Sequence, residues 1–254
     1  MQKLRKIVRD AGVLHLGSRA IAFVYRRAIR PLLPKEPVRY AGIVTGVDRR
    51  WGDGRVPALW RPYAGRDMPE YEAALLQGLE QHVREGDRVV VVGGGYGVTA
   101  TFSAQRAGVS GRVECYEGAR EGTERVRRTA ERNGVADRVR IHHAVVARPI
   151  SVYGAQPEGA VVAPGDLPEC DVLELDCEGA EVEILRHLRI SPRVILVETH
   201  GLFGAPTPLV LELLRERGYQ AEVIGVAEPR MKEYCEKHDI RVVAGTRADG
   251  PAGV

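Results

Sequence analysis

Hydrophobic and polar positions follow two alternating rhythms along the last two thirds of the chain. Residues 88–92, RVVVV, form an apolar run of the kind found in strands that are buried on both faces of a parallel sheet. The same reading predicts strands at 88–92, 112–116, 138–146, 171–176, 193–199, 220–226 and 240–245. Apolar residues at helical spacing predict helices at 98–107, 120–133, 179–188 and 207–217. This alternation predicts a doubly wound α/β sheet.

The connection that leads into the last predicted strand is unusual. Residues 227–239 join it to the strand before, and they lack the pattern of a full amphipathic crossover helix. A strand that follows such a connection need not run parallel to its predecessor. We therefore expect residues 240–245 to return antiparallel at the edge of the sheet.

A different pattern precedes residue 67. Apolar residues at helical spacing, interleaved with basic ones, predict an amphipathic helical arm over residues 3–33. Two β-like runs, 38–47 and 55–63, flank the turn-prone stretch RRWGDG and predict a hairpin. A helix at 68–83 follows, with Pro69 in its first turn. We expect an extension over residues 1–66 and an α/β domain over 67–254.

The charge is concentrated in the arm. The formal net charge is +3, yet residues 1–40 hold ten Lys or Arg and only two acids, so the remainder is net negative. Three interpretations of the arm remain: a helical cap on the domain, a peripheral contact of residues 1–33 with an anionic membrane surface, or nucleic-acid binding. The net-negative body and an aromatic content of 6% count against nucleic acid.

The remaining composition is typical of a cytoplasmic protein. No stretch approaches the roughly 20 apolar residues that span a membrane, and the N-terminus lacks the apolar core of a secretory signal. The four cysteines form no CxxC pair, so we expect reduced thiols and no metal site. The localisation that follows is cytoplasmic, with peripheral membrane attachment through the arm as the variant.

The most informative short segment is the glycine-rich turn after residues 88–92. It comprises Gly93, Gly94, Gly95, Tyr96 and Gly97, and such a turn lies where ligands bind in open α/β sheets. A dinucleotide fingerprint would require a small residue three positions after its second glycine, where Val98 stands. The spacing Gly-x-Gly-x-Gly instead fits a nucleoside cofactor such as S-adenosylmethionine. The alternative is that the glycines only allow a helix to pack against a strand.

An acid follows the next predicted strand. Glu117 stands 24 residues after Gly93, close to the spacing of about 20 at which a carboxylate binds ribose hydroxyls. A nicotinamide enzyme would show the same feature, and an acid at a helix start would look similar. Glu117 therefore supports nucleoside binding without choosing the cofactor.

Residues 171–188, DVLELDCEGAEVEILRHL, resemble the DxEGxE segment of the FkbM family of methyltransferases. The resemblance extends from about residue 71 to 201. It implies the class I methyltransferase fold, a Rossmann-like sheet of seven strands with the last one antiparallel, and S-adenosylmethionine as cofactor. It also implies O-methylation of a hydroxyl on a sugar, glycan or other small metabolite.

The resemblance assigns roles to several residues. The glycines of the turn would contact the cofactor, Glu117 would bind ribose, and His143 with Ala144 would flank adenine. Asp176 would stand beside the reacting methyl group. One position departs from the family, which has Asp where this chain has Val91.

Methyl transfer to an alcohol also needs a group that takes up its proton. Candidates follow the predicted strands at 171–176 and 193–199: Asp176, Glu178, Glu198 and His200. We choose His200 as general base because its ordinary pKa is near neutral, with Glu198 holding its ring and Asp176 orienting substrate or cofactor. Glu178 and Glu181 are also explained by a helix N-terminus, where acids are favoured. Nothing in the sequence requires a metal.

Three rival functions remain. An RNA methyltransferase would use the basic arm, and a non-catalytic nucleoside-binding relative would explain Val91. A NAD-dependent reductase is disfavoured by Val98.

Overall fold

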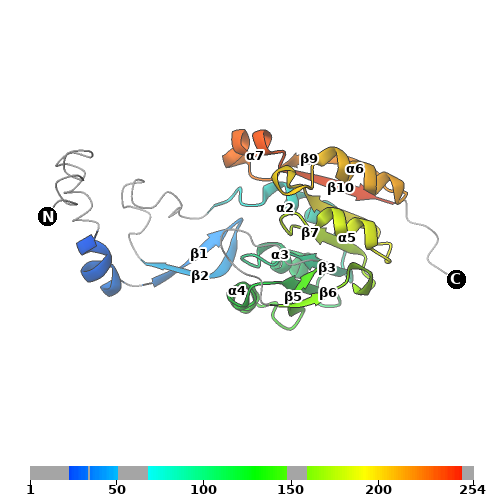
Figure 1. The fold of residues 1–254 in the computed structure, drawn as a ribbon. Helices are drawn as coiled ribbons and strands as arrows, with labels where there is room; N and C mark the ends of the chain where they lie inside the picture. The colour runs from blue at the N-terminus through cyan, green and yellow to red at the C-terminus, as the bar shows by residue number, and fades with distance from the viewer. Residues whose placement is uncertain (1–22, 34, 51–67, 148–158, 248–254) are drawn as a thin grey trace, which may run out of the picture. The chain divides into compact units, whose positions relative to one another are not determined.

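The computed structural model describes residues 23–33, 35–50, 68–147 and 159–247 of the chain (Figure 1). It divides into two compact units. One comprises Met1–Val38 with Asp48–Arg66, and the other comprises Arg39–Val47 with Asp67–Val254. Residues 39–47, which the sequence pattern places in the extension, thus group with the α/β unit.

The described part of the first unit is small. It contains a π-helical turn, η1 (Tyr25–Ile29), and a 3-10 turn, η2 (Arg30–Leu32). An ion pair joins Arg49 Nε to Glu36 Oε1 at 2.9 Å. Most of the predicted helical arm, residues 1–22, and the predicted strand at 55–63 lie outside the described residues.

The predicted hairpin pairs different residues from those expected. Strands β1 (Lys35–Tyr40) and β2 (Ile43–Arg50) form a two-stranded sheet, so the run 38–47 contains both strands of the hairpin. The chain reverses at Ala41 and Gly42, whose φ values are +47° and +79°. Two successive positive φ values are those of a tight turn whose twist matches a hairpin. The turn was missed because Ala41 carries no turn signal and Gly42 alone is a weak one.

The second unit is built on a sheet of eight strands, and its order is β6-β5-β4-β3-β7-β8-β10-β9. The strands are β3 (Arg88–Val92), β4 (Arg112–Glu117), β5 (Val139–Val146), β6 (Ala160–Val162), β7 (Val172–Leu175), β8 (Val194–Glu198), β9 (Gln220–Val226) and β10 (Arg241–Thr246). Only β10 runs antiparallel to its neighbours, β8 and β9. The predicted doubly wound sheet with its last strand antiparallel is confirmed, and β6 adds a short edge strand that was not predicted.

Strand β10 lies inside the sheet, so its expected place at the edge is wrong. The edge strand is β9, and β10 is inserted between β9 and β8. The side chains explain this order, because Val242, Val243 and Ala244 are buried while β9 exposes several of its residues. An apolar strand covered on both faces is stable between two neighbours, whereas an edge strand tolerates polar positions.

Helices cover both faces of the sheet (Figure 1). They are α2 (Ala73–His82), α3 (Val98–Arg106), α4 (Arg120–Arg132), α5 (Glu181–His187), α6 (Thr207–Glu216) and α7 (Lys232–His238). Alternate strand residues face opposite layers. Val90 and Val92 of β3 belong to the core beneath α5 and α6, whereas Leu196 of β8 contacts Gly78 of α2. The strand order reverses between β3 and β7, so the carboxyl ends of these strands form the switch point where ligands bind.

Helix α2 begins later than predicted, so Pro69 does not lie in its first turn. Met68 pairs through its backbone with residues 39 and 41 of the hairpin, and Glu72 adopts a left-handed conformation with φ +49°. The helix starts at Ala73, after these constraints. The backbone bonds to the hairpin fix residues 68–72 as a turn and prevent helical pairing.

One hydroxyl links strand β2 to the glycine-rich turn. The Oγ1 atom of Thr129, on α4, accepts a hydrogen bond from Gly46 N of β2 at 2.7 Å and donates to Tyr96 O at 2.7 Å. Thr129 is fully buried. Strand β2 and the glycine-rich turn are therefore held by the same side chain.

All four cysteines are free thiols, and Cys115, Cys170 and Cys235 are buried. Among the described helices, none is both long enough and apolar enough to cross a membrane.

Candidate functional site

The glycine-rich turn follows β3 at the switch point of the sheet. Gly93 has φ +106°, and a Cβ atom there would lie 1.7 Å from the backbone oxygen of Asp176. No side chain fits at that distance, so the neighbouring strand end itself requires glycine at this position. The turn is thereby held directly against the residue that follows β7.

Gly95 needs glycine for another reason. Its φ is +50°, and a Cβ atom there would have no neighbour within 4 Å. By contrast, a Cβ atom at Gly97 would lie 2.8 Å from Val126 Cα, in the contact between α3 and α4. Close packing thus accounts for Gly93 and Gly97 but leaves Gly95 facing open space. Among the four glycines of the turn, Gly95 alone is exposed.

Glu117 ends β4 beside this turn, and its carboxylate holds the backbone in place. Its Oε2 accepts a hydrogen bond from Gly95 N at 2.9 Å, and its Oε1 accepts one from Ala119 N at 2.8 Å. A carboxylate offers about four acceptor positions, so both oxygens retain capacity for further donors. The acid that the sequence singles out therefore lies next to the open part of the turn.

His143 and Ala144 lie one strand further out. His143 pairs with Glu117 in the register of β4 and β5, and its Nε2 lies 3.2 Å from Gly118 O. Ala144 is buried and pairs with Ala160 of β6. The structure therefore brings the predicted adenine-flanking pair beside the predicted ribose-binding acid, along the same edge of the sheet.

Three tyrosines from distant segments meet above the turn, and the sequence pattern gave no sign of them. Tyr40 stacks on Tyr71 with ring centroids 4.6 Å apart, and Tyr96 of the turn meets Tyr40 edge-on at 5.2 Å. The guanidinium of Arg125 lies 5.4 Å from the Tyr96 ring centroid. Such pairs favour fixed ring positions, so the hairpin tip, the start of α2 and the turn are linked by aromatic contacts.

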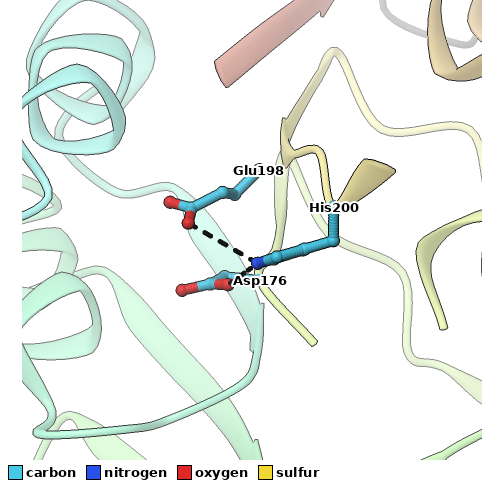
Figure 2. A group of neighbouring side chains, drawn as sticks. All are labelled: Asp176, Glu198 and His200. Carbon is cyan, nitrogen blue, oxygen red and sulfur yellow. Dashed lines mark ion pairs between the residues drawn. The ribbon is translucent and has the colours of Figure 1, made fainter. Parts of the chain in front are cut away.

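A second group of side chains gathers where β7 and β8 end. Asp176 follows β7, Glu198 is the last residue of β8, and His200 follows two positions later. Figure 2 shows both carboxylates directed at one nitrogen of the imidazole. His200 Nε2 lies 3.6 Å from Asp176 Oδ1 and 3.6 Å from Glu198 Oε1. The three predicted catalytic residues are thus brought together.

The sequence led us to expect that Glu198 holds the ring of His200, but the structure assigns this role to Glu181. His200 Nδ1 lies 2.9 Å from Glu181 Oε1. Glu181 is fully buried, and its oxygens also accept hydrogen bonds from Cys177 N at 3.1 Å and Gly179 N at 2.7 Å. Sequence reasoning explained Glu181 as a helix-start acid, which it is, since it begins α5. Its second role depends on β8 ending beside α5, which no local pattern reveals.

Asp176, Glu198 and His200 line a cavity that opens to solvent. Its acidic side chains are Glu72, Asp176, Glu178, Glu198 and Glu228. Its apolar and aromatic walls include Tyr71, Leu202, Phe203, Met231, Tyr234 and Ile240. None of the described residues that line the cavity is Lys or Arg. The polar floor is therefore anionic, with His200 as its one imidazole.

The pKa values in this group reflect burial without basic partners. Burial raises the pKa of Asp176 to about 6, against the opposing charge of His200. Burial and then the charge of Asp176 raise the pKa of Glu178 to about 7 and that of Glu198 well above its ordinary value. Burial lowers the pKa of His200, but the bond to Glu181 and the charge of Asp176 outweigh it, and the pKa is raised. The group favours binding positive charge.

The structure places a carboxylate opposite Val91, the position at which the resemblance led us to expect an acid. Val91 pairs with Glu174 in the register of β3 and β7. Glu174 is fully buried, its Oε2 lies 3.3 Å from Thr99 Oγ1, and its Oε1 has no hydrogen-bond partner among the described residues. Glu174 falls within the apolar pattern of β7, so the sequence gave no sign of a functional role for it.

No protein-family model matches the sequence, and no curated protein matches it. Several solved structures are similar. A precorrin-6y C5,15-methyltransferase from Geobacter metallireducens has a TM-score of 0.49 at 18% identity, over 71% of this chain and 90% of that one. A SAM-dependent O-methyltransferase from Thermotoga maritima has a TM-score of 0.46 at 19% identity, over 77% and 71%. A putative rRNA methylase from Clostridium thermocellum has a TM-score of 0.46 at 13% identity, over 70% and 98%.

Proposed function

We propose that the protein is an S-adenosylmethionine-dependent methyltransferase of the FkbM type that methylates a hydroxyl group on a sugar, glycan or other small metabolite. The observation that carries this proposal is the open backbone at Gly95, held by Glu117 at the switch point, with the cluster of Asp176, Glu198 and His200 at the neighbouring strand ends. A cofactor site and a proton-accepting site thus lie on one edge of the sheet.

The cofactor's charge suits these surroundings. S-Adenosylmethionine carries a sulfonium and an ammonium group, both positive, and the described cavity side chains supply carboxylates without any Lys or Arg. In this proposal Gly93 to Gly97 pass beneath the amino-acid half, Glu117 binds the ribose, and His143 with Ala144 flank the adenine. Glu174 supplies the buried acid that the chain lacks at Val91.

The acceptor hydroxyl faces Asp176, Glu198 and His200. When bound, S-adenosylmethionine would supply a methyl group on a positively charged sulfur, and transfer to the hydroxyl oxygen would form the O–C bond as the S–C bond breaks, with its electron pair left on sulfur. The products are a methyl ether and neutral S-adenosylhomocysteine, and the hydroxyl proton passes to the anionic floor of the cavity. Holding the oxygen in line with the S–C bond supplies much of the rate, and a positioned base adds about 10²–10⁴-fold.

Calorimetric titration of the full chain tests the cofactor assignment. We expect S-adenosylmethionine and S-adenosylhomocysteine to bind with one site per chain, and NAD⁺ not to bind. Glu117→Gln removes a charged acceptor and should weaken S-adenosylhomocysteine by about 1.5–3 kcal/mol, or roughly tenfold to a hundredfold. Glu121→Gln, which changes an exposed acid on α4, is the matched control and should leave affinity unchanged. Binding of neither nucleoside, or preference for NAD⁺, would overturn the proposal.

A further inference from the structure

We propose that Asp176, Glu198 and His200 form a binding site for a divalent metal cation, although the sequence led us to expect none. One carboxylate oxygen from each acid and His200 Nε2 lie within 4.8 Å of one another. The metal site itself stands on this geometry, and only its use in catalysis rests on the proposed function.

The separations within the group suit a shared cation. His200 Nε2 is 3.6 Å from an oxygen of each carboxylate, which is longer than the roughly 2.7–3.0 Å of a charge-assisted hydrogen bond. Metal–ligand bonds of about 2.1 Å place neighbouring ligand atoms about 3.0 Å apart in an octahedron and about 3.4 Å apart in a tetrahedron. Small side-chain movements therefore bring all three atoms onto one ion.

The imidazole is prepared for the role of ligand. Glu181 already accepts two backbone N–H bonds, so its bond with His200 Nδ1 is one in which the ring donates. A proton on Nδ1 leaves the lone pair on Nε2, the atom that faces Asp176 and Glu198 (Figure 2). A carboxylate that orients a histidine in this way is the usual outer partner of a metal-bound imidazole.

Glu198 provides an independent indication. The residue is only 9% exposed, it lines the cavity, and its carboxylate makes no hydrogen bond among the described residues. A buried carboxylate without a donor is costly unless a proton or a cation neutralises it. The described lining offers no Lys or Arg for this purpose. A cation between Glu198, Asp176 and His200 supplies the missing charge.

The ligand set indicates the kind of metal. One imidazole with two carboxylates is a mixed nitrogen and oxygen ligand set. Such a set suits first-row divalent ions such as Mn²⁺, Fe²⁺ or Zn²⁺. Three protein ligands leave coordination positions open toward the cavity, where the acceptor hydroxyl lies in the proposed function. A coordinated hydroxyl loses its proton more readily. With a metal bound, His200 would be a ligand, and Glu178, which lines the same cavity, would be the carboxylate available to accept the proton.

Titration of the metal-stripped full chain with Mn²⁺, followed by electron paramagnetic resonance of the free ion, tests the site. We expect one Mn²⁺ per chain, displaced by Zn²⁺. Glu198→Gln and His200→Gln should each weaken Mn²⁺ binding at least about tenfold. Glu228→Gln removes the same charge from the same cavity without removing a ligand, so it should change the affinity less than about threefold.

Two results would overturn the proposal: no stoichiometric Mn²⁺ or Zn²⁺ binding by the wild-type chain, or an equal loss in Glu228→Gln and Glu198→Gln. The first result would mean that a proton on His200 neutralises the carboxylates. Thermal melting in EDTA checks that the variants fold, and Glu198→Gln carries the test if His200→Gln does not fold. S-Adenosylhomocysteine binding measured in EDTA separates the two proposals, because the cofactor site should not require the metal.

Discussion

Replacing Gly95 with alanine adds one methyl group at the only position of the glycine-rich turn where the described structure leaves room for it. The Cβ atom would meet no atom within 4 Å, so the folded chain without ligand accommodates the methyl group. The cost is confined to the backbone, because φ is +50° and an L-residue in the left-handed region loses about 1–2 kcal/mol.

The effect on the cofactor should be larger than the effect on folding. A strain of about 1 kcal/mol lowers the melting temperature of a chain of this size by about 2–4 °C. If S-adenosylmethionine lies over Gly95, the methyl group must displace it, and forcing an extra methyl group into a packed contact costs about 1–3 kcal/mol. We therefore expect affinity for S-adenosylhomocysteine to fall about fivefold to more than a hundredfold.

The matched control is Gly134→Ala. Gly134 has φ +69°, its Cβ atom would also meet nothing within 4 Å, and it lies after α4, away from the glycine-rich turn. Both variants should melt slightly below the wild type by differential scanning fluorimetry. Only Gly95→Ala should bind S-adenosylhomocysteine more weakly by calorimetry. Equal affinities in the two variants would refute the placement of the cofactor over this turn.

Three further predictions concern folding. Gly93→Ala should prevent stable folding, judged by circular dichroism, because its Cβ atom would lie 1.7 Å from Asp176 O; a native-like melt would contradict this geometry. Thr129→Val should lose about 1–3 kcal/mol in urea denaturation, since it leaves two buried backbone groups unpaired; retention of full stability would show that these bonds are not needed. Burial, followed by Arg193, lowers the pKa of His82, so the unfolded chain binds a proton that the folded chain does not. The free energy of unfolding should therefore fall as the pH drops below about 6.5, and it should fall less in His82→Gln. Identical pH profiles of unfolding in the wild type and the variant would contradict this role of His82.

The strands were largely predictable because their apolar runs are long and regular, except for the three-residue strand β6. β3 exposes only Arg88, and helices α3, α4, α5 and α6 begin and end within about two residues of the predicted bounds. The position of β10 was not predictable from its direction alone. It follows from comparing its burial with that of β9, and burial depends on which neighbours a strand acquires.

The candidate site was predictable where residues follow strand ends, and not where they meet by tertiary packing. Asp176, Glu198 and His200 come together because parallel strands deliver their carboxyl ends to one edge. The partner of His200 could not be assigned this way, because Glu181 reaches it from the first turn of α5. The tyrosine cluster depends on a turn at residues 41 and 42 for which Gly42 is the single, weak sequence signal.

The buried thiols give the protein an internal reporter of its own unfolding. Cys115 lies in the middle of β4 with no exposed surface, and Cys170 immediately precedes the β7 region and is nearly as enclosed. Burial raises the pKa of Cys170 to about 12 and that of Cys115 well above its ordinary value, so neither forms a thiolate while the sheet is closed. An alkylating reagent can react with these thiols only after the strands separate. Its rate of incorporation at these two positions therefore measures how often the centre of the sheet opens, without any added label.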